Sequence, residues 1–286
     1  MIKKILTTLY FFMIIFVSNL EAHNLQESIK SDHRSPINII RDNSRNPYET
    51  LSFFEIKPEM TVVELSPGGG WYTEILAMYL YDEGRLITAP YNPASGDYAQ
   101  RMLKIFVKKL KSNEVYKKVE IKYLFEKLAE DATVDAVLTF RNVHNWLDNN
   151  ANGAKKIFQQ AFSALKPGGI FGVVDHRASP GTSLTDMYNS GYVTEKYIIN
   201  LSNQIGFILS DKSEINANWK DKKDYSMGVW TLPPTYRLKD IDREIKKIKK
   251  YHEKILITAN SFREKLLDTT KALNGSINKL NESKQK

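Results

Sequence analysis

The chemistry of this sequence is concentrated in a glycine-rich turn within residues 61–71, TVVELSPGGGW. The apolar residues before the turn, interrupted only by Glu64, predict a short strand covered on both faces. Three consecutive glycines permit positive φ angles and let the backbone approach a ligand closely. The helix expected from about Trp71 to Tyr81 directs unpaired N–H groups into the same space, and Glu64 can accept hydrogen bonds from a ribose hydroxyl or an amine. The turn therefore predicts a nucleotide-type site, with a plain strand–turn–helix as the alternative.

Two histidines are candidate bases, because histidine titrates near neutral pH. His144 lies in a polar and aromatic cluster, RNVHNW at 141–146, and His176 follows Asp175 at the end of an apolar segment. Asp175 can orient His176, although adjacent residues of a strand point to opposite faces, so both enter one pocket only where the strand has ended. The alternative for each histidine is a structural role. We expect no metal, since a site that pairs a histidine with an aspartate of the 213–225 segment has little support.

The elements that position these residues alternate between strands and helices. We expect strands at 62–65, 85–88, 119–124, 134–140, 170–174, 207–210 and 228–232, and helices at 47–54, 71–81, 100–110, 155–165 and 193–205. This alternation predicts an α/β fold with a doubly wound, mainly parallel sheet of seven strands. Ligands on such sheets bind beyond the carboxyl ends of the strands. The glycine turn, the segment after Phe140 and the Asp175–His176 pair are therefore expected on one rim.

Several segments carry a resemblance to a known family. The order of an acid-tipped strand, a glycine loop, an apolar fourth strand and KPGG before a fifth strand resembles the class I S-adenosylmethionine-dependent methyltransferases. The sequence is more similar still to a group of exported predicted methyltransferases with no established substrate. The resemblance covers roughly Pro47 to Pro234 and implies a Rossmann-like sheet and methyl transfer from S-adenosylmethionine to a small-molecule acceptor. The segments that carry it are VVELSPGGGWYTEIL (62–76), TFRNVHNW (139–146), LKPGGIFGVVDHRA (165–178) and SEINANWKDKKDY (213–225).

The resemblance also implies roles for single residues. Glu64 and the glycine turn would hold the methionine moiety and the ribose of the cofactor, and Asn142 would face the sulfonium or the substrate. Two positions depart from the family pattern: Ser66 replaces the first glycine, and the second strand ends in TAPYN at 88–92 without the usual acid. Asn92 would then bind the ribose through weaker, neutral hydrogen bonds, which lowers the expected cofactor affinity by about tenfold. The predicted cofactor-binding residues are Glu64, Ser66, Pro67, Gly68, Gly69, Gly70, Trp71, Asn92 and Asn142, and the predicted catalytic residues are His144, Asp175 and His176.

The first 22 residues have the pattern of a secretory signal. A cationic start is followed by an apolar run from Ile5 to Leu20 and by the small residue Ala22, after which we expect cleavage. The protein is thus expected to be exported, to the periplasm, with an uncleaved anchor as the alternative. The chain has no cysteine, which excludes lipoprotein attachment, disulfides and thiolate chemistry. Residues 23–46 are polar and expected to be irregular.

The net charge of +8 comes mainly from the C-terminal tail, residues 237–286. The body from His23 to Tyr236, which includes the expected domain at 47–236, is neutral, so the sequence does not indicate a nucleic-acid partner. Apolar residues recur three and four positions apart from Leu238 to Leu273, which predicts a long amphipathic helix with a heptad stripe. We expect this helix to form a coiled coil or to pack on its own domain, rather than to lie on a membrane.

Three functions compete on the sequence alone. The first is a methyltransferase that uses S-adenosylmethionine. The second is an exported, non-catalytic ligand-binding protein on a methyltransferase fold, favoured by the missing ribose acid and by a cofactor that is made in the cytoplasm. The third, a nicotinamide oxidoreductase, is disfavoured because its GxGxxG motif requires glycine where Thr73 stands.

Overall fold

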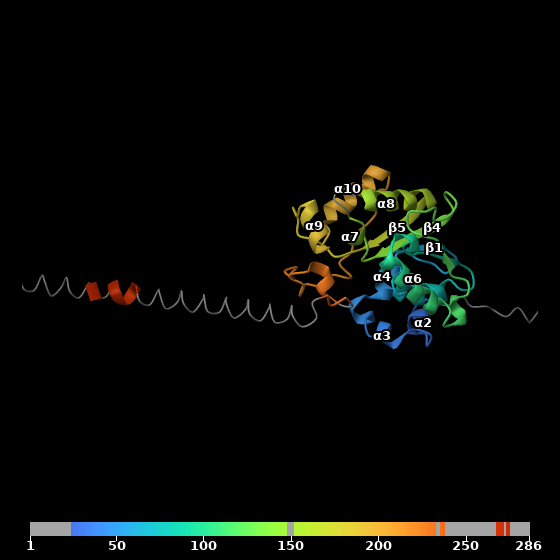
Figure 1. Ribbon diagram of the computed structural model, residues 1–286, viewed down its shortest axis with the longest axis horizontal. Coiled ribbons are helices and arrows are strands. Elements are labelled where there is room, and N and C mark those ends of the chain that lie inside the picture. Colours follow the sequence, from blue (N-terminus) through green and yellow to red (C-terminus); the bar gives the residue numbers. More distant parts are fainter. Residues whose placement is uncertain (1–23, 148–151, 233–234, 238–266, 272, 275–286) are drawn as a thin grey trace, which may run out of the picture. The chain divides into compact units, whose positions relative to one another are not determined.

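A computed structural model describes residues 24–147, 152–232, 235–237, 267–271 and 273–274. The chain divides into two compact units, one up to Asp221 and one from Lys222 on, and each is described by itself. The first unit contains one sheet of five parallel strands in the order β3-β2-β1-β4-β5 (Figure 1). The chain builds outward from β1 in both directions, so the predicted α/β class and doubly wound arrangement are confirmed. The strands are β1 Thr61–Leu65, β2 Arg85–Ala89, β3 Glu120–Ile121, β4 Val134–Phe140 and β5 Leu165–Val174.

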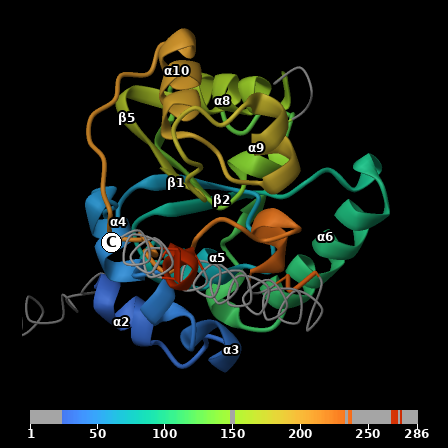
Figure 2. The ribbon, with the colours of Figure 1, turned by 90° about the vertical axis from the view of Figure 1, so that its left-hand side faces the viewer.

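Helices cover both faces of this sheet. α8 and α10 lie over one face, and α4, α5 and α6 lie on the other side (Figures 1 and 2). α10 begins where the Thr194 hydroxyl accepts from the Tyr197 N–H, and it ends at Gly206 in the left-handed conformation. The helices of this unit are α2 Leu25–Lys30, α3 Pro36–Ile39, α4 Pro47–Phe53, α5 Trp71–Tyr79, α6 Asp97–Leu110, α7 Val143–Trp146, α8 Asn152–Ala164, α9 Leu184–Ser190 and α10 Glu195–Ile205, with short 3₁₀ turns at Asp42–Ser44, Pro93–Ser95 and Glu114–Tyr116.

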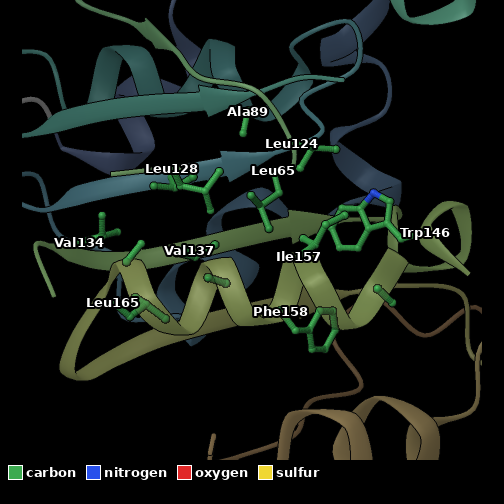
Figure 3. Packing of buried hydrophobic residues seen from close by; sticks show 14 of the residues in the cluster. Leu65, Ala89, Leu124, Leu128, Val134, Val137, Trp146, Ile157, Phe158 and Leu165 are labelled. Carbon is green, nitrogen blue, oxygen red and sulfur yellow. The ribbon is translucent and has the colours of Figure 1, made fainter. Parts of the chain in front are cut away.

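The two layers of core follow from the alternation of side chains along the strands. Val63 and Leu65 of β1 pack with residues of α8 and α10, and Val62, on the opposite face, packs with residues of α4 and α5. Figure 3 shows Ile157 and Phe158 of α8 against this sheet. Complete burial of each such side chain contributes about 1.5–3 kcal/mol to stability. A rigid sheet therefore supports the loops at the carboxyl ends of its strands.

Two of the seven expected strands are not strands. Residues 207–210 form no strand: after Gly206, Phe207 stacks on Phe171, but Ile208 is 90% exposed. In the second unit, Gly228–Thr231 is a 3₁₀ turn instead of a strand. Short apolar runs carry no periodicity that separates a strand from a packed loop or turn, which explains both errors.

The segment before α4 is ordered, contrary to the expected irregular structure. α2 packs on α5 through Leu25 and Ile29, and α3 with the turn before it attaches to α5 through the buried carboxylate of Glu74. That carboxylate accepts hydrogen bonds from the Ser35 N–H and the Asn38 amide, and it forms ion pairs with Lys109 and Arg34. The expectation failed because only a few apolar residues of the segment are packed, and the rest of its attachment depends on polar contacts across the fold that leave no hydrophobic pattern in the sequence.

Two of the predicted segments lie largely outside the described residues. The leader at 1–22 is not described, and of the predicted tail helix only 267–271 and 273–274 are described, where the chain is helical. In the described part of the chain, every helix is too short or too polar to span a bilayer.

Candidate functional site

The carboxyl ends of β1, β4 and β5 bring the predicted site residues to one edge of the sheet. The Asn142 amide nitrogen, just after β4, donates to the carbonyl oxygens of Leu65 (3.3 Å) and Ser66 (3.2 Å) at the end of β1. The backbone N–H of His144 donates to Asp175 at the end of β5 (3.0 Å). The same Asn142 nitrogen also reaches the Phe140 carbonyl oxygen (3.1 Å). Asn142 thus joins β4 to the glycine turn through that nitrogen.

The glycine turn presents an open face. Ser66, Gly68 and Gly70 have φ angles of 50°, 58° and 80°, and Gly70 leads directly into α5. A Cβ atom added to Gly68 or Gly69 would meet no atom of the described chain within 4 Å, whereas one at Gly70 would meet the Lys109 side chain at 2.8 Å. The turn therefore leaves room for a ligand above its first two glycines and packs tightly at the third.

Ser66 is strained, and its hydroxyl lies in a small polar group. A non-glycine residue in the left-handed conformation costs about 1 kcal/mol or more. The buried Ser66 hydroxyl and the buried Trp146 indole nitrogen have no partner of good hydrogen-bond geometry among the described residues. Both interact with the Tyr91 hydroxyl: burial raises the pKa of Tyr91 to about 12, and hydrogen bonding to Trp146 and Ser66 opposes that rise. A ligand at the turn can therefore complete the hydrogen bonding of these two atoms.

Glu64 is more deeply engaged than the sequence suggested. It is 3% exposed and accepts a hydrogen bond of 2.6 Å from the Thr73 hydroxyl, which ties β1 to α5. Burial raises the pKa of Glu64 to about 7, opposed by the Thr73 hydrogen bond and the charge of Arg45. Glu64 therefore has a structural contact in addition to any contact with a ligand.

His144 and Asp175 form a buried side-chain pair. His144 Nδ1 lies 2.7 Å from Asp175 Oδ1, and the other carboxylate oxygen accepts from the His144 N–H. Burial favours the neutral carboxyl of Asp175, but the charge and hydrogen bond of His144, with a smaller contribution from His176, hold the pKa of Asp175 below its usual value. Asp175 therefore orients His144 as a charged carboxylate.

The predicted orientation of the His176 ring by Asp175 is wrong. Asp175 accepts only the backbone N–H of His176 (2.8 Å), while the ring nitrogen Nε2 accepts from Arg141 Nε (3.0 Å). Burial, and next the charge of Arg141, lower the pKa of His176 to about 3. Because adjacent residues leave a strand in opposite directions, the carboxylate reaches a histidine distant in sequence and not its neighbour. The two histidine rings lie 5.7 Å apart, edge to face.

Asn92 is fully engaged with its own surroundings. Its side-chain oxygen caps the 3₁₀ turn at Ala94 N (2.8 Å), and its nitrogen donates to Glu126 (2.5 Å). Glu126, an exposed residue between β3 and β4, thus brings a carboxylate beside the end of β2. Sequence reasoning missed Glu126 because nothing in its local pattern distinguishes it from a surface acid.

The remaining predicted residues are Trp71 and Pro67. The Trp71 indole donates to the Asn38 carbonyl oxygen (2.8 Å) and is 5% exposed, so this side chain lies beneath the N-terminal segment. The Pro67 carbonyl oxygen accepts from the Gly70 N–H (2.9 Å) and closes the turn. Among the described residues there is no cluster of three or more metal-ligating side chains. A surface hollow of about 630 Å³ between the 125–131 segment and α8 includes none of the predicted site residues.

Comparisons with solved structures find similar chains. A SAM-dependent methyltransferase from Aquifex aeolicus is 17% identical (TM-score 0.47), with coverage of 66% of this chain and 91% of that one. The [4+2]-cyclase SpnF is 14% identical (TM-score 0.48; 65% and 70%). A Haemonchus contortus phosphoethanolamine N-methyltransferase 2, in complex with S-adenosyl-L-methionine, is 16% identical (TM-score 0.44; 64% and 40%). No protein-family model matches the chain, and no curated protein matches it. At these identities, function has to be argued from the site itself.

Proposed function

We propose that this protein is an S-adenosylmethionine-dependent methyltransferase that acts on a small-molecule acceptor. The observation that carries the proposal is the open glycine turn on the same edge of a parallel sheet as the His144–Asp175 pair, with Asn142 joining the two strand ends. Such an edge is where ligands of doubly wound sheets bind. The resemblance of segments 62–76, 139–146 and 165–178 to exported methyltransferases supports the same function.

The turn fits this cofactor. The buried Ser66 hydroxyl can donate to and accept from the amino-acid part of a ligand, and the open space above Gly68 and Gly69 can take its methionine moiety. When bound, S-adenosylmethionine supplies a methyl group on a positively charged sulfur, which is ready for attack by a nucleophile. Glu64 lies next to this turn, and its pKa of about 7 lets it be either charged or neutral near neutral pH.

His144 is placed to take the acceptor's proton. The Asp175 carboxylate accepts the proton carried by His144 Nδ1, which makes Nε2 the basic nitrogen. His144 Nε2 would take the proton of an acceptor oxygen or nitrogen as that atom bonds to the methyl carbon and the carbon–sulfur bond breaks, with S-adenosylhomocysteine as the leaving group, and Asp175 would stabilise the resulting imidazolium. His176 stays neutral at physiological pH and accepts a hydrogen bond from Arg141. This bond holds the His176 ring in place beside the ring of His144.

A second candidate is an exported ligand-binding protein without catalysis. The specific observation in its favour is that both polar groups of Asn92 are engaged, by Ala94 and Glu126, at the strand end where the family has a ribose-binding acid. A weaker ribose contact favours a ligand other than the cofactor.

We also propose a location and partners. The cationic and apolar pattern of residues 1–22 supports export to the periplasm with cleavage after Ala22, and cell fractionation tests it: protein found only in the cytoplasm would contradict export. The heptad stripe from Leu238 to Leu273 supports self-association or contact with a surface through the tail. The near-neutral domain supports a small molecule, and not a nucleic acid, as substrate.

The test of the proposed function is calorimetric titration of the chain from His23 on with S-adenosylmethionine and S-adenosylhomocysteine. Binding in the micromolar range supports the methyltransferase. An absence of heat up to millimolar ligand, with circular dichroism showing folded protein, would favour the ligand-binding protein instead.

A further inference from the structure

A half-buried arginine without an anionic partner lies next to the candidate site. The guanidinium of Arg45 stacks over the Trp71 ring, 4.7 Å from its centroid, and makes no hydrogen bond or ion pair with any described residue. Burial, and next the charges of Arg141 and Arg41, lower the pKa of Arg45 to about 9. A guanidinium held away from water, and repelled by two others, is stabilised when an anion joins it.

Arg45 and Arg141 come from distant parts of the chain to the same place. The Tyr72 ring stacks on Phe140, with centroids 3.5 Å apart, and its hydroxyl donates to the Arg45 carbonyl oxygen (3.3 Å). Arg141 directly follows Phe140 and takes a φ of 64°, a strained conformation for a non-glycine residue. From there its Nε donates to His176, the neighbour of Asp175. These backbone and side-chain contacts connect Arg45 to the neighbourhood of the His144–Asp175 pair.

The carboxylates in this region are already engaged elsewhere. Asp42 takes both terminal nitrogens of Arg34, each at 2.8 Å, and Glu74 is bonded to Lys109. Asp175 is bonded to His144, and the pKa of Glu64, about 7, leaves its carboxyl partly neutral at physiological pH. The positive charge of Arg45 is therefore offset only in part, by Glu64 and Tyr72, and no described carboxylate forms an ion pair with it.

We propose that Arg45, with Arg141 beside it, binds a carboxylate or phosphate group of the methyl acceptor and so holds the acceptor against the His144–Asp175 pair. The planar fork of a guanidinium matches two oxygens of a carboxylate or phosphate, and the Trp71 face holds the Arg45 fork in one plane. The identity of the ligand as an acceptor rests on the proposed function. The same chemistry is present in the carboxylate of the cofactor's methionine moiety, and the experiment separates the two.

The first arm of the test measures phosphate binding by thermal unfolding and calorimetry, with chloride at matched ionic strength as reference. Arg45→Met keeps the aliphatic bulk over Trp71, and Arg85→Met is the matched control, because Arg85 is exposed and paired with Glu120. We expect phosphate to raise the melting temperature of the wild type and of Arg85→Met, and its dissociation constant to rise at least tenfold in Arg45→Met. Equal phosphate binding by Arg45→Met and wild type, both folded by circular dichroism, would overturn the proposal.

The second arm repeats the titration with S-adenosylhomocysteine. Phosphate binding that persists with S-adenosylhomocysteine bound, together with an unchanged affinity of Arg45→Met for S-adenosylhomocysteine, supports an acceptor group. Competition between the two ligands, with both weakened in Arg45→Met, assigns Arg45 to the cofactor's carboxylate and overturns the acceptor. If S-adenosylhomocysteine fails to bind at all while phosphate binds through Arg45, the methyltransferase proposal fails and the anion site remains.

Discussion

At the scale of single residues, the contacts of Asp175 distinguish the two candidate bases. Its carboxylate lies 2.7 Å from the ring of His144 and touches His176 only through the backbone. The two histidines therefore have different surroundings: His144 is paired with a carboxylate, whereas His176 is buried and faces Arg141, which favours its neutral form. Only the first has the environment of a general base.

Asp175→Asn should change the protonated nitrogen of His144. A neutral amide can donate its own N–H to Nδ1, so the imidazole proton moves to Nε2 and the base is lost. We expect nitrogen NMR to show His144 protonated at Nδ1 in the wild type and at Nε2 in the variant, and methyl transfer to fall by roughly 10²–10⁴-fold. Asp131→Asn, at an exposed position, is the control; an unchanged tautomer in Asp175→Asn would contradict the pairing.

His176 should make stability depend on pH. Its pKa is lowered to about 3 in the folded chain from 6.5, so below 6.5 the unfolded chain takes up a proton that the folded one does not, and stability is lost as pH falls from 6.5 toward 3. Each pH unit in that window costs up to about 1.4 kcal/mol. Glu64 acts in the opposite direction, because its raised pKa of about 7 gives stability below 4.5 that is lost as pH rises through 7.

The contribution of His176 is therefore measured as a difference between variants. In urea unfolding at pH 7 and pH 5, we expect the wild type to lose about 2 kcal/mol relative to His176→Asn, whose amide oxygen can still accept from Arg141. Glu64→Gln removes the opposing dependence and should make the loss larger. Parallel pH profiles for wild type and His176→Asn would show that His176 titrates normally.

At the scale of elements, two neighbouring glycines of the turn have different surroundings: one is packed against a helix and the other faces open space. Gly70 has a φ of 80° and touches α6, whereas Gly69 has no positive φ and faces open space. The same substitution at neighbouring positions should therefore have different effects.

Gly70→Ala should destabilise the fold by at least about 1 kcal/mol, because its Cβ is strained and meets Lys109 at 2.8 Å. Gly69→Ala should change the free energy of unfolding by less than about 0.5 kcal/mol and weaken binding of S-adenosylhomocysteine, since its methyl group fills the space of the ligand. Urea unfolding and calorimetry on both variants check this. Full affinity in Gly69→Ala would place the ligand elsewhere.

At the scale of the whole molecule, the C-terminal tail concentrates the basic charge and an apolar stripe. If the stripe mediates self-association, Ile248→Asp should convert the full chain to a monomer, because a charge in a heptad seam has to be desolvated. Lys249→Asp, outside the stripe, is the control. Light scattering after size exclusion measures the mass; a wild type that is already monomeric would contradict self-association.

The sequence alone determined the order along the chain of the five strands of the sheet and the edge on which the candidate site residues gather. Buried strands such as 134–140 are β-branched and apolar, glycines and KPGG mark the turns, and parallel strands bring their carboxyl ends together. These are local properties and general rules of topology, so residues 61–71, His144 and Asp175 could be placed on one rim without coordinates.

The tertiary structure decided the contacts between those residues. The pairing of Asp175 with His144, the engagement of Asn92 by Glu126 and the attachment of the N-terminal segment through Glu74 join residues at least 31 positions apart. The same holds for Arg45, whose charge lacks an ion-pair partner among the described residues because the nearby carboxylates are bonded elsewhere. Directional hydrogen bonds and charges depend on ångström-scale placement of side chains from separate elements, and no periodicity along the chain records that placement.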